Sequence, residues 1–283
     1  MRNNSDRLQR NSAPDDAPVE AATKSGNIFD FVAPTEIVDL PSKGKFYPEG
    51  HPLHGVDQIE IRFMTAKDED ILSSPTLLKK GIAIDRFLQN IILDKTIDVR
   101  SLLIGDKNAL IIASRITGFG HEYPVGMTCG TCAHQHEYVF DLTEIEAKEP
   151  GDLDELGATL TDEGTVKTTL PYTKIEAQIR PLLVEDEYKI ADAVKRQESR
   201  GQEPTPYTTQ LKTMICALND VSNRAQIHQF VDIMPTRDSK HINSIYNKVF
   251  PNIDMRQRVE CPQCAAAEEV NVPITVNFFW SRE

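Results

Sequence analysis

Two Cys-x-x-Cys pairs in similar sequence contexts constrain the fold of this chain most strongly. The first pair is Cys129 and Cys132, and the second is Cys261 and Cys264. Each pair lies between two strand-like segments, which predicts a β-hairpin whose tight turn carries two thiolates. One such turn supplies half of a tetrahedral metal site, and two turns supply all four ligands. The long segment between the pairs must therefore fold back to bring the turns together.

We expect these four cysteines to hold one structural Zn²⁺ per chain. A site of four thiolates leaves no coordination position for water or substrate, so the ion would be structural and not catalytic. Two disulfides, free or redox-active thiols and an iron–sulfur centre are alternatives for the same residues. The fifth cysteine, Cys216, lies in an apolar stretch that we interpret as helical. There it would pack as a small buried hydrophobic residue.

The segments that precede the two cysteine pairs also resemble each other, which indicates a tandem duplication. Asp106 and Asp238 are separated by 132 residues, as are the two cysteine pairs, and each precedes an apolar stripe of helical period that it would N-cap. Farther upstream, residues 61–69 and 179–187 share four of nine amino acids. Between these blocks, two apolar sets share a helical period: Ile84, Phe87, Leu88 and Ile91, and Leu211, Met214, Ile215 and Leu218.

The second copy is longer, because the upstream blocks are offset by 118 residues and not by 132. We place the extra residues in the polar, breaker-rich segment 197–206. Amphipathic helices can share a period by chance, but the common order of strand, helices, capped helix, strand, cysteine turn and strand favours duplication. The predicted fold class is α+β, with two copies joined by one zinc-ribbon-like four-cysteine site. Neither copy would be complete alone.

The composition along the chain suggests five regions. We expect a disordered tail over 1–27, an extended arm over 28–56, the first copy over 57–143, an acidic linker over 144–168 and the second copy over 169–283. The apolar, turn-rich arm lies outside both copies, so we expect it to bind a partner without being needed for either core. The alternative is that the arm packs across its own domain as an extra edge strand.

The charge and hydropathy exclude several classes of function. The chain has 43 acidic and 31 basic residues, for a net charge of −12. This balance argues against a nucleic-acid-binding surface, which needs clustered Lys and Arg. We find no apolar run long enough to span a membrane and no signal sequence at the start. Cysteines that act as metal ligands fit a reducing cytoplasm.

No group of residues indicates an enzyme or a small-molecule substrate. The segment 42–45 resembles a phosphate-binding loop but lacks the required glycine and Ser/Thr positions. His134 and His136 could replace a cysteine ligand, although solvated hairpin histidines are the simpler interpretation. The acidic run 68–70 fits the first turn of a helix, where the macrodipole favours carboxylates. We therefore expect no catalytic residue and no cofactor-binding residue apart from the metal ligands.

Three stretches resemble a known protein family: residues 31–44, 62–72 and 77–85. Together with the first cysteine turn, they are similar to the baseplate hub assembly proteins of T-even-type contractile-tailed bacteriophages. The resemblance covers about residues 29–142 and is weaker beyond. It implies a non-enzymatic role in building the central hub, as a hub component or as an assembly chaperone. A fainter likeness, in acid-led helices and the ending 116–119, is to tail assembly chaperones that bind the tape measure protein.

The resemblance also implies partners and a location. The partner would be a baseplate hub or tape measure protein, with no membrane and no nucleic acid involved. The protein would act in the cytoplasm of the infected bacterium during assembly, or lie in the virion tail. Two other functions stay open at this point. One is a stable structural subunit of the tail without chaperone action, and the other is an acidic zinc-ribbon module that acts as a regulator or with nucleic acid.

Overall fold

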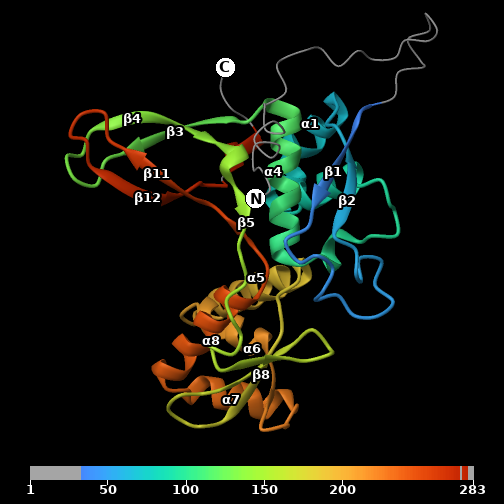
Figure 1. Cartoon of the computed structure of the whole chain (residues 1–283), viewed down its shortest axis with the longest axis vertical. Coiled ribbons are helices and arrows are strands. Elements are labelled where there is room, and N and C mark those ends of the chain that lie inside the picture. The colour runs from blue at the N-terminus through green and yellow to red at the C-terminus, as the bar shows by residue number, and fades with distance from the viewer. Residues whose placement is uncertain (1–32, 275, 280–283) are drawn as a thin grey trace, which may run out of the picture. The chain divides into compact units, whose positions relative to one another are not determined.

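The computed structural model describes residues 33–274 and 276–279, and in this range helices alternate with several small antiparallel sheets (Figure 1). The fold class is therefore α+β, as predicted. The tail predicted over 1–27, and the first residues of the predicted arm, lie outside the described residues.

The first half of the described chain begins with a two-stranded antiparallel sheet. In β2, Ile59 and Ile61 are buried while their neighbours Gln58 and Glu60 are exposed, which is the alternation of a strand with one face on a core. Helices then cover this face, and α4 is the longest of them. The elements are β1 (Thr35–Asp39), β2 (Gln58–Arg62), α1 (Ala66–Ser73), α2 (Pro75–Lys80), α3 (Ala83–Ile91), the 3₁₀ turn η3 (Val99–Ser101) and α4 (Ile104–Phe119).

The second half contains a four-stranded antiparallel sheet with the order β6-β7-β8-β9. Its helices α5 to α8 pack with this sheet around a second apolar core. The elements are β6 (Ala158–Leu160), β7 (Val166–Thr169), β8 (Glu176–Ile179), α5 (Val184–Ser199), α6 (Pro206–Met214), β9 (Ile215–Leu218), α7 (Arg224–Ile233) and α8 (Thr236–Val249).

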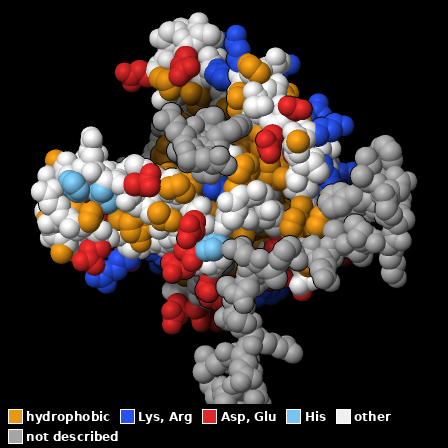
Figure 2. Space-filling view, turned by 90° about the horizontal axis from the view of Figure 1, so that it is seen from above, with side chains coloured by type: hydrophobic (Ala, Val, Ile, Leu, Met, Phe, Trp, Pro, Cys, Tyr) orange, Lys and Arg blue, Asp and Glu red, His pale blue; other side chains and the backbone are white. Residues whose placement is uncertain are grey.

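Each half ends in a β-hairpin, and the two hairpins run side by side away from α4 (Figure 1). In the view from above, hydrophobic side chains are visible along the hairpins, with histidine near their far end (Figure 2). The hairpins are β3 (Glu122–Thr128) with β4 (Gln135–Asp141), and β11 (Arg256–Glu260) with β12 (Ala267–Asn271). The remaining elements are η4 (Leu142–Glu144), β5 (Glu146–Ala147) paired with β10 (Ile253–Asp254), and η5 (Val276–Phe279).

The first apolar core is completed by residues from the far end of the chain. Phe278 packs edge-on against Tyr123, and Phe279 packs edge-on against Phe87. Val259 and Val272 of the second hairpin region are buried in the same core. The two halves are further joined by a short antiparallel bridge in which Ile104 N–H donates to the Leu182 carbonyl and Val184 N–H to the Leu102 carbonyl. The described residues from Thr35 onward accordingly form one compact unit.

The prediction of an arm outside the first core is wrong for residues 35–56. Thr35–Asp39 is strand β1, paired with β2 along its whole length. Val38, Leu40 and Tyr47 are buried in the first core. The backbone N–H and C=O groups of the half-buried strand β2 need hydrogen-bond partners, and pairing with β1 supplies these partners. The edge-strand alternative therefore describes this segment.

The acidic linker predicted over 144–168 is also wrong in part. Residues 146–147 and 158–160 form the strands β5 and β6, and β7 begins at Val166. Ala158 and Val166 are buried in the second core. The acidic residues indicated a linker because they occupy exposed positions, while the few apolar residues among them face the core.

Cys216 lies on a strand and not in a helix, so that prediction is wrong. Helix α6 ends at Met214, and Ile215 begins β9, where it pairs with Ile179. The corresponding bridge in the first half joins Ile92 to Ile61. By these pairings Ile215 takes the place of Ile92, whereas the matched helical periods had aligned it with Leu88, one helical turn earlier. A helical period repeats at every turn, so it cannot reveal a shift of one turn.

When the two halves are compared element by element, the additional length of the second half does not all fall in 197–206. The first half crosses from Ile92 to α4 with the three-residue turn η3, whereas the second half places the ten-residue helix α7 in the same interval. Part of the length difference is therefore a lengthened connection before α8.

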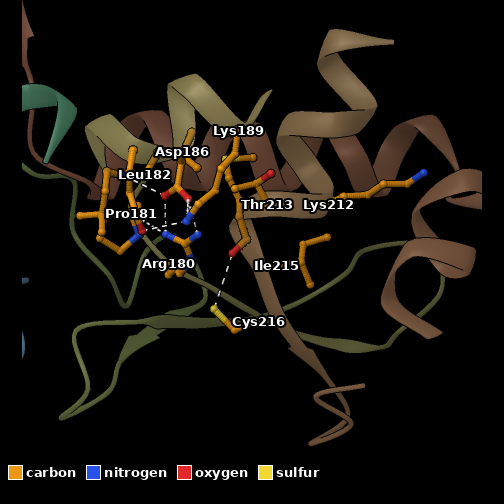
Figure 3. A network of polar contacts seen from close by, with 12 residues as sticks. Arg180, Pro181, Leu182, Asp186, Lys189, Lys212, Thr213, Ile215 and Cys216 are labelled. Carbon is orange, nitrogen blue, oxygen red and sulfur yellow. Dashed lines mark hydrogen bonds and ion pairs between the residues drawn. The ribbon is translucent and has the colours of Figure 1, made fainter. Parts of the chain in front are cut away.

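The same polar motif occurs at the first helix after β2 and after β8. Arg62 donates two hydrogen bonds to the Asp68 carboxylate, at 2.7 and 3.0 Å. Arg180 does the same to Asp186, at 2.7 and 2.9 Å (Figure 3). Both carboxylates are fully buried and stand at the third position of their helices, where each also accepts from the N–H of the N-cap residue. In both places the motif ties the end of the strand to the first turn of the helix that follows it.

The prediction that Asp106 and Asp238 are N-caps is wrong, but the two residues do occupy equivalent places. The N-caps are Leu103 and Pro235, and each aspartate is the third residue of its helix and fully buried. Asp106 accepts from the backbone N–H of Ser42, and Asp238 accepts from the N–H groups of Tyr172 and Thr173. In both halves the carboxylate thus holds the turn that follows a strand.

Candidate metal centre

The cysteine turns sit where the two hairpins end their strand pairing. The last pair of the first hairpin is Thr128 with Gln135, and the last pair of the second is Glu260 with Ala267. In each strand pair the side chains alternate between the two faces, so the strands set the direction in which the turn presents its sulfur atoms. The sequence correctly predicted both hairpins and the positions of their turns.

The two turns have the same backbone geometry. In the first, Cys129 N–H donates to the His134 carbonyl at 2.9 Å and Ala133 N–H donates to the Cys129 carbonyl at 3.0 Å. In the second, both corresponding bonds from Cys261 and Ala265 are 2.9 Å long. Ala133 and Ala265 have φ values of 57° and 54°, in the left-handed region. Each turn thus brings its two cysteines to one side of the hairpin tip.

The structure brings all four predicted cysteines together. The Sγ atoms of Cys129 and Cys264 are 3.7 Å apart, as are those of Cys132 and Cys261, and all four lie within 4.8 Å of one another. A tetrahedral ion with Zn–S bonds of about 2.3 Å would separate its sulfurs by about 3.8 Å. The donor set and its spacing therefore fit a zinc ion. The same distances are far longer than a disulfide bond of about 2.05 Å.

The pairing of the sulfurs crosses between the hairpins in a symmetric way. The first cysteine of each turn is buried and the second is exposed, and the short distances join a first cysteine to a second in both cases. A rotation that exchanges the two hairpin tips exchanges these two contacts. The two turns therefore contribute to the cluster in the same way, with matching sulfur contacts and matching burial.

The electrostatics of the cluster favour a cation. The backbone N–H groups of Cys132 and Thr131 lower the pKa of Cys129 to about 6. Although the N–H of His134 favours the thiolate of Cys132, hydrogen bonds to the neighbouring sulfurs raise the pKa of Cys132 to about 12. Negative charges this close repel one another, so a fully deprotonated set needs a bound cation. A divalent ion would hold all four as thiolates.

The two histidines beside the first turn do not join the cluster. Their rings stack at 5.8 Å between centroids, and the group of potential ligands within 4.8 Å contains only the four cysteines among the described residues. Both ring nitrogens of His136 are buried without a hydrogen-bond partner in the described part of the chain. The interpretation of both histidines as solvated hairpin residues is therefore wrong for the ring nitrogens of His136.

Several residues that sequence reasoning did not identify hold the hairpins in place. Tyr138 donates to the Arg258 carbonyl at 3.2 Å, which joins β4 to β11. Gln257 donates to the Asp141 carbonyl at 2.5 Å. Arg115 of α4 is fully buried and donates to the carbonyls of Gly120, Glu122 and Phe278. The sequence offered only one signal for these contacts, the charged residue Arg115 in the otherwise largely apolar helix α4. This signal did not indicate which residues Arg115 contacts.

Four cysteines thus lie close enough to hold one metal ion, at the tips of two matched hairpins that project from an α+β protein. The family model described as T4 bacteriophage base plate protein matches residues 33–280 of this chain. The chain therefore belongs to this family of phage baseplate proteins. Neither a curated protein sequence nor a solved structure matches it significantly.

The family places the chain among the components of the phage tail or of its assembly. The resemblance to baseplate proteins of T-even-type phages, stated from the sequence, is thereby confirmed. None of the helices in the described ranges is both long and apolar enough to cross a membrane.

Proposed function

We propose that the protein takes part in building the central hub of the phage baseplate through contacts with other proteins, without catalysing a reaction. The observation that carries this proposal is the baseplate family match over residues 33–280. A fixed body whose two halves share cores and a closed cysteine centre suits a protein that grips another subunit. It would work in the cytoplasm of the infected bacterium, with a hub or tape measure protein as its partner.

We further propose that Cys129, Cys132, Cys261 and Cys264 hold one structural Zn²⁺ per chain. The sulfur spacing and the crowding of negative charge support this proposal. When bound, the ion would join two segments that are far apart in the sequence, so its binding free energy would add to folding free energy. Its role would be to lock the second hairpin against the first.

The two halves are, in our proposal, copies of one ancestral unit. The equivalent Arg–Asp pairs, the equivalent buried aspartates at Asp106 and Asp238 and the identical cysteine turns support it. Each of these is a specific polar arrangement, which chance similarity of amphipathic helices would not produce. The first copy would then comprise residues 35–142, and the second would comprise residues 158–274.

The proposed role is tested by tagging the protein in the phage genome and purifying it from infected cells before lysis. We expect enrichment of a hub or tape measure protein over the same purification with an untagged phage. Mass spectrometry of purified virions then separates the two roles, because a hub component is present in the particle and a chaperone is absent. Recovery of the protein without any baseplate protein would contradict the proposal.

A further inference from the structure

A cleft with an apolar floor lies where four separate parts of the chain meet. It has a volume of about 380 Å³ and is formed by the turn 41–46 after β1, residues 147–153 at and after the end of β5, Leu160 of β6 and residues 248–251 at the end of α8. Phe46 and Leu153 are partly buried there, Phe250 is buried, and Leu160 is 39% exposed. A cleft of this volume can hold a small ligand or a few side chains of another protein.

Four lysines line this cleft in a chain of net charge −12: Lys43, Lys45, Lys148 and Lys248. None of them forms an ion pair with a carboxylate of the described residues, although Lys148 lies near enough to Asp254 to help Arg256 lower the pKa of that carboxyl. The lining also contains Glu149 and Asp152. The Asp152 carboxylate accepts from the N–H groups of residues 154 and 155, so it caps its own turn. Glu149 is exposed and forms no ion pair among the described residues, so Lys43, Lys45 and Lys248 are available to an external anion.

Two of these lysines are presented by a turn that is held rigidly. Asp106 accepts from both the N–H and the hydroxyl of Ser42, and the Ser42 hydroxyl accepts from Gly44 N–H. Gly44 has a φ of 69°, and a Cβ there would lie 2.4 Å from the Val56 nitrogen. A turn fixed in this way loses little conformational entropy when its side chains bind a ligand.

Lys43 occupies a backbone conformation that usually selects another residue. Its φ is 50°, in the left-handed region that favours Gly and Asn. Strain of this kind is concentrated at functional sites and tight turns, and Lys174, in a turn outside the cleft, also has it, with a φ of 60°. Lys248 has a separate explanation, because it lies in the last turn of α8, where the helix macrodipole favours a cation. The other three lysines are outside helices.

We propose that this cleft binds an acidic segment of another baseplate protein. One aromatic or aliphatic side chain of that segment would occupy the floor, and flanking carboxylates would pair with the lysines. The inference rests on the proposed function, because it assumes that the chain works through protein contacts. It names a site and a partner chemistry that the family membership does not contain.

The test uses the full-length protein and a fluorescein-labelled twelve-residue peptide in which Asp and Glu alternate with Phe and Leu. Fluorescence anisotropy gives its affinity for the wild type and for the variant Lys43→Asn/Lys248→Gln. Asn tolerates the left-handed conformation, so this variant keeps the turn. We expect affinity to fall about fivefold to tenfold, the effect of losing two exposed charge pairs. The variant Lys79→Gln/Lys80→Gln, with the same net charge change on α2, is expected to bind as the wild type.

Two control peptides test each part of the recognition. Replacing Phe and Leu by Ser, or Asp and Glu by Asn and Gln, is expected to abolish binding in both cases. Equal binding by both lysine variants, or competition by inorganic phosphate at millimolar concentration, would overturn the proposal. Tighter peptide binding after removal of residues 1–32 would indicate that the chain's own N-terminal segment occupies the cleft. That result would overturn the proposal that another protein does so. The two proposals fail separately. If the peptide results overturn the cleft as a binding site but the Lys43→Asn/Lys248→Gln variant still co-purifies with baseplate proteins, the proposed function stands.

Discussion

At the scale of single residues, the cysteines carry the clearest test. We expect purified protein to contain about one Zn²⁺ per chain, and Cys129→Ser or Cys261→Ser to release it. Each substitution should lower stability by several kcal/mol, because metal binding is coupled to folding. Elemental analysis and thermal unfolding measure the two effects. Cys216→Ser is the matched control, since Cys216 lies on β9 outside the cluster. Two zinc ions per chain, or full metal content in the Cys261 variant, would contradict a shared site.

A second residue-scale prediction concerns acid. Burial alone would raise the pKa of Asp68, but hydrogen bonds from Arg62, Thr65 and Asn90 lower it to about 2. Since the folded pKa lies below the unfolded value of about 3.9, the carboxylate stabilises the fold above pH 4 and loses this effect as the pH falls towards 2. Asp68→Asn should therefore cost about 2 kcal/mol at pH 7 and flatten the loss of stability between pH 4 and 2.

The measurement is urea unfolding of Asp68→Asn and wild type across this pH range. Asp70→Asn is the control, because Asp70 is exposed on the same helix α1. An Asp68 variant with unchanged stability at pH 7 would show that the pair with Arg62 contributes nothing net, as some buried ion pairs do.

A third prediction concerns a close approach of two backbone segments at Gly105. A Cβ on Gly105, in the first turn of α4, would lie 2.2 Å from the carbonyl oxygen of Pro251 and 2.8 Å from the Asn252 Cα. Backbone on both sides cannot give way cheaply, so Gly105→Ala should destabilise the protein by about 2 kcal/mol or more. Gly126→Ala, where no atom lies within 4 Å of the new Cβ, should have little effect. Equal melting temperatures for the two variants would contradict this close packing.

At the scale of elements, β1 replaces the arm expected from the sequence. Deleting residues 1–47 removes the strand partner of β2 and the buried side chains Val38, Leu40 and Tyr47. We expect this deletion to unfold the first core, which circular dichroism and proteolysis detect. Val38→Ala should cost about 1–2 kcal/mol, whereas Ile37→Ala on the exposed face of the same strand should cost less than about 0.5 kcal/mol. A deletion variant that keeps its melting temperature would restore the arm hypothesis.

The elements also show which sequence signals were sufficient. The cysteine turns were predictable because the residues that define them are adjacent and their chemistry is specific. β9 was not predictable, since the run 215–218 is uniformly apolar and fits a buried strand or a helix equally well. The burial of Asp106 depends on Ser42 and Tyr47, more than fifty residues away, and no local pattern indicates such a contact. Local chemistry could therefore be predicted, whereas long-range contacts could not, except for the meeting of the two cysteine turns, which complementary chemistry requires.

At the scale of the whole molecule, the halves share structure that neither can supply alone. A fragment of residues 33–143 lacks Val259, Val272, Phe278 and Phe279, which belong to the first core. We expect this fragment to be aggregation-prone or unfolded, and adding residues 144–283 in trans with zinc to recover a folded complex. Size-exclusion chromatography with circular dichroism measures both states. A monomeric, cooperatively unfolding fragment would contradict the shared core.

The position of Phe278 and Phe279 has a consequence for synthesis in the cell. The ribosome makes these residues long after Phe87 of α3 and Tyr123 of β3, so the surfaces that they cover stay open until this distant segment has been synthesised. The first half then completes its core only after the second half has been made, and contacts between residues so distant in sequence form slowly. During that interval the nascent chain exposes apolar surface, which favours aggregation. The amount of folded protein in an infected cell should therefore depend on the timing of expression and on the supply of chaperones.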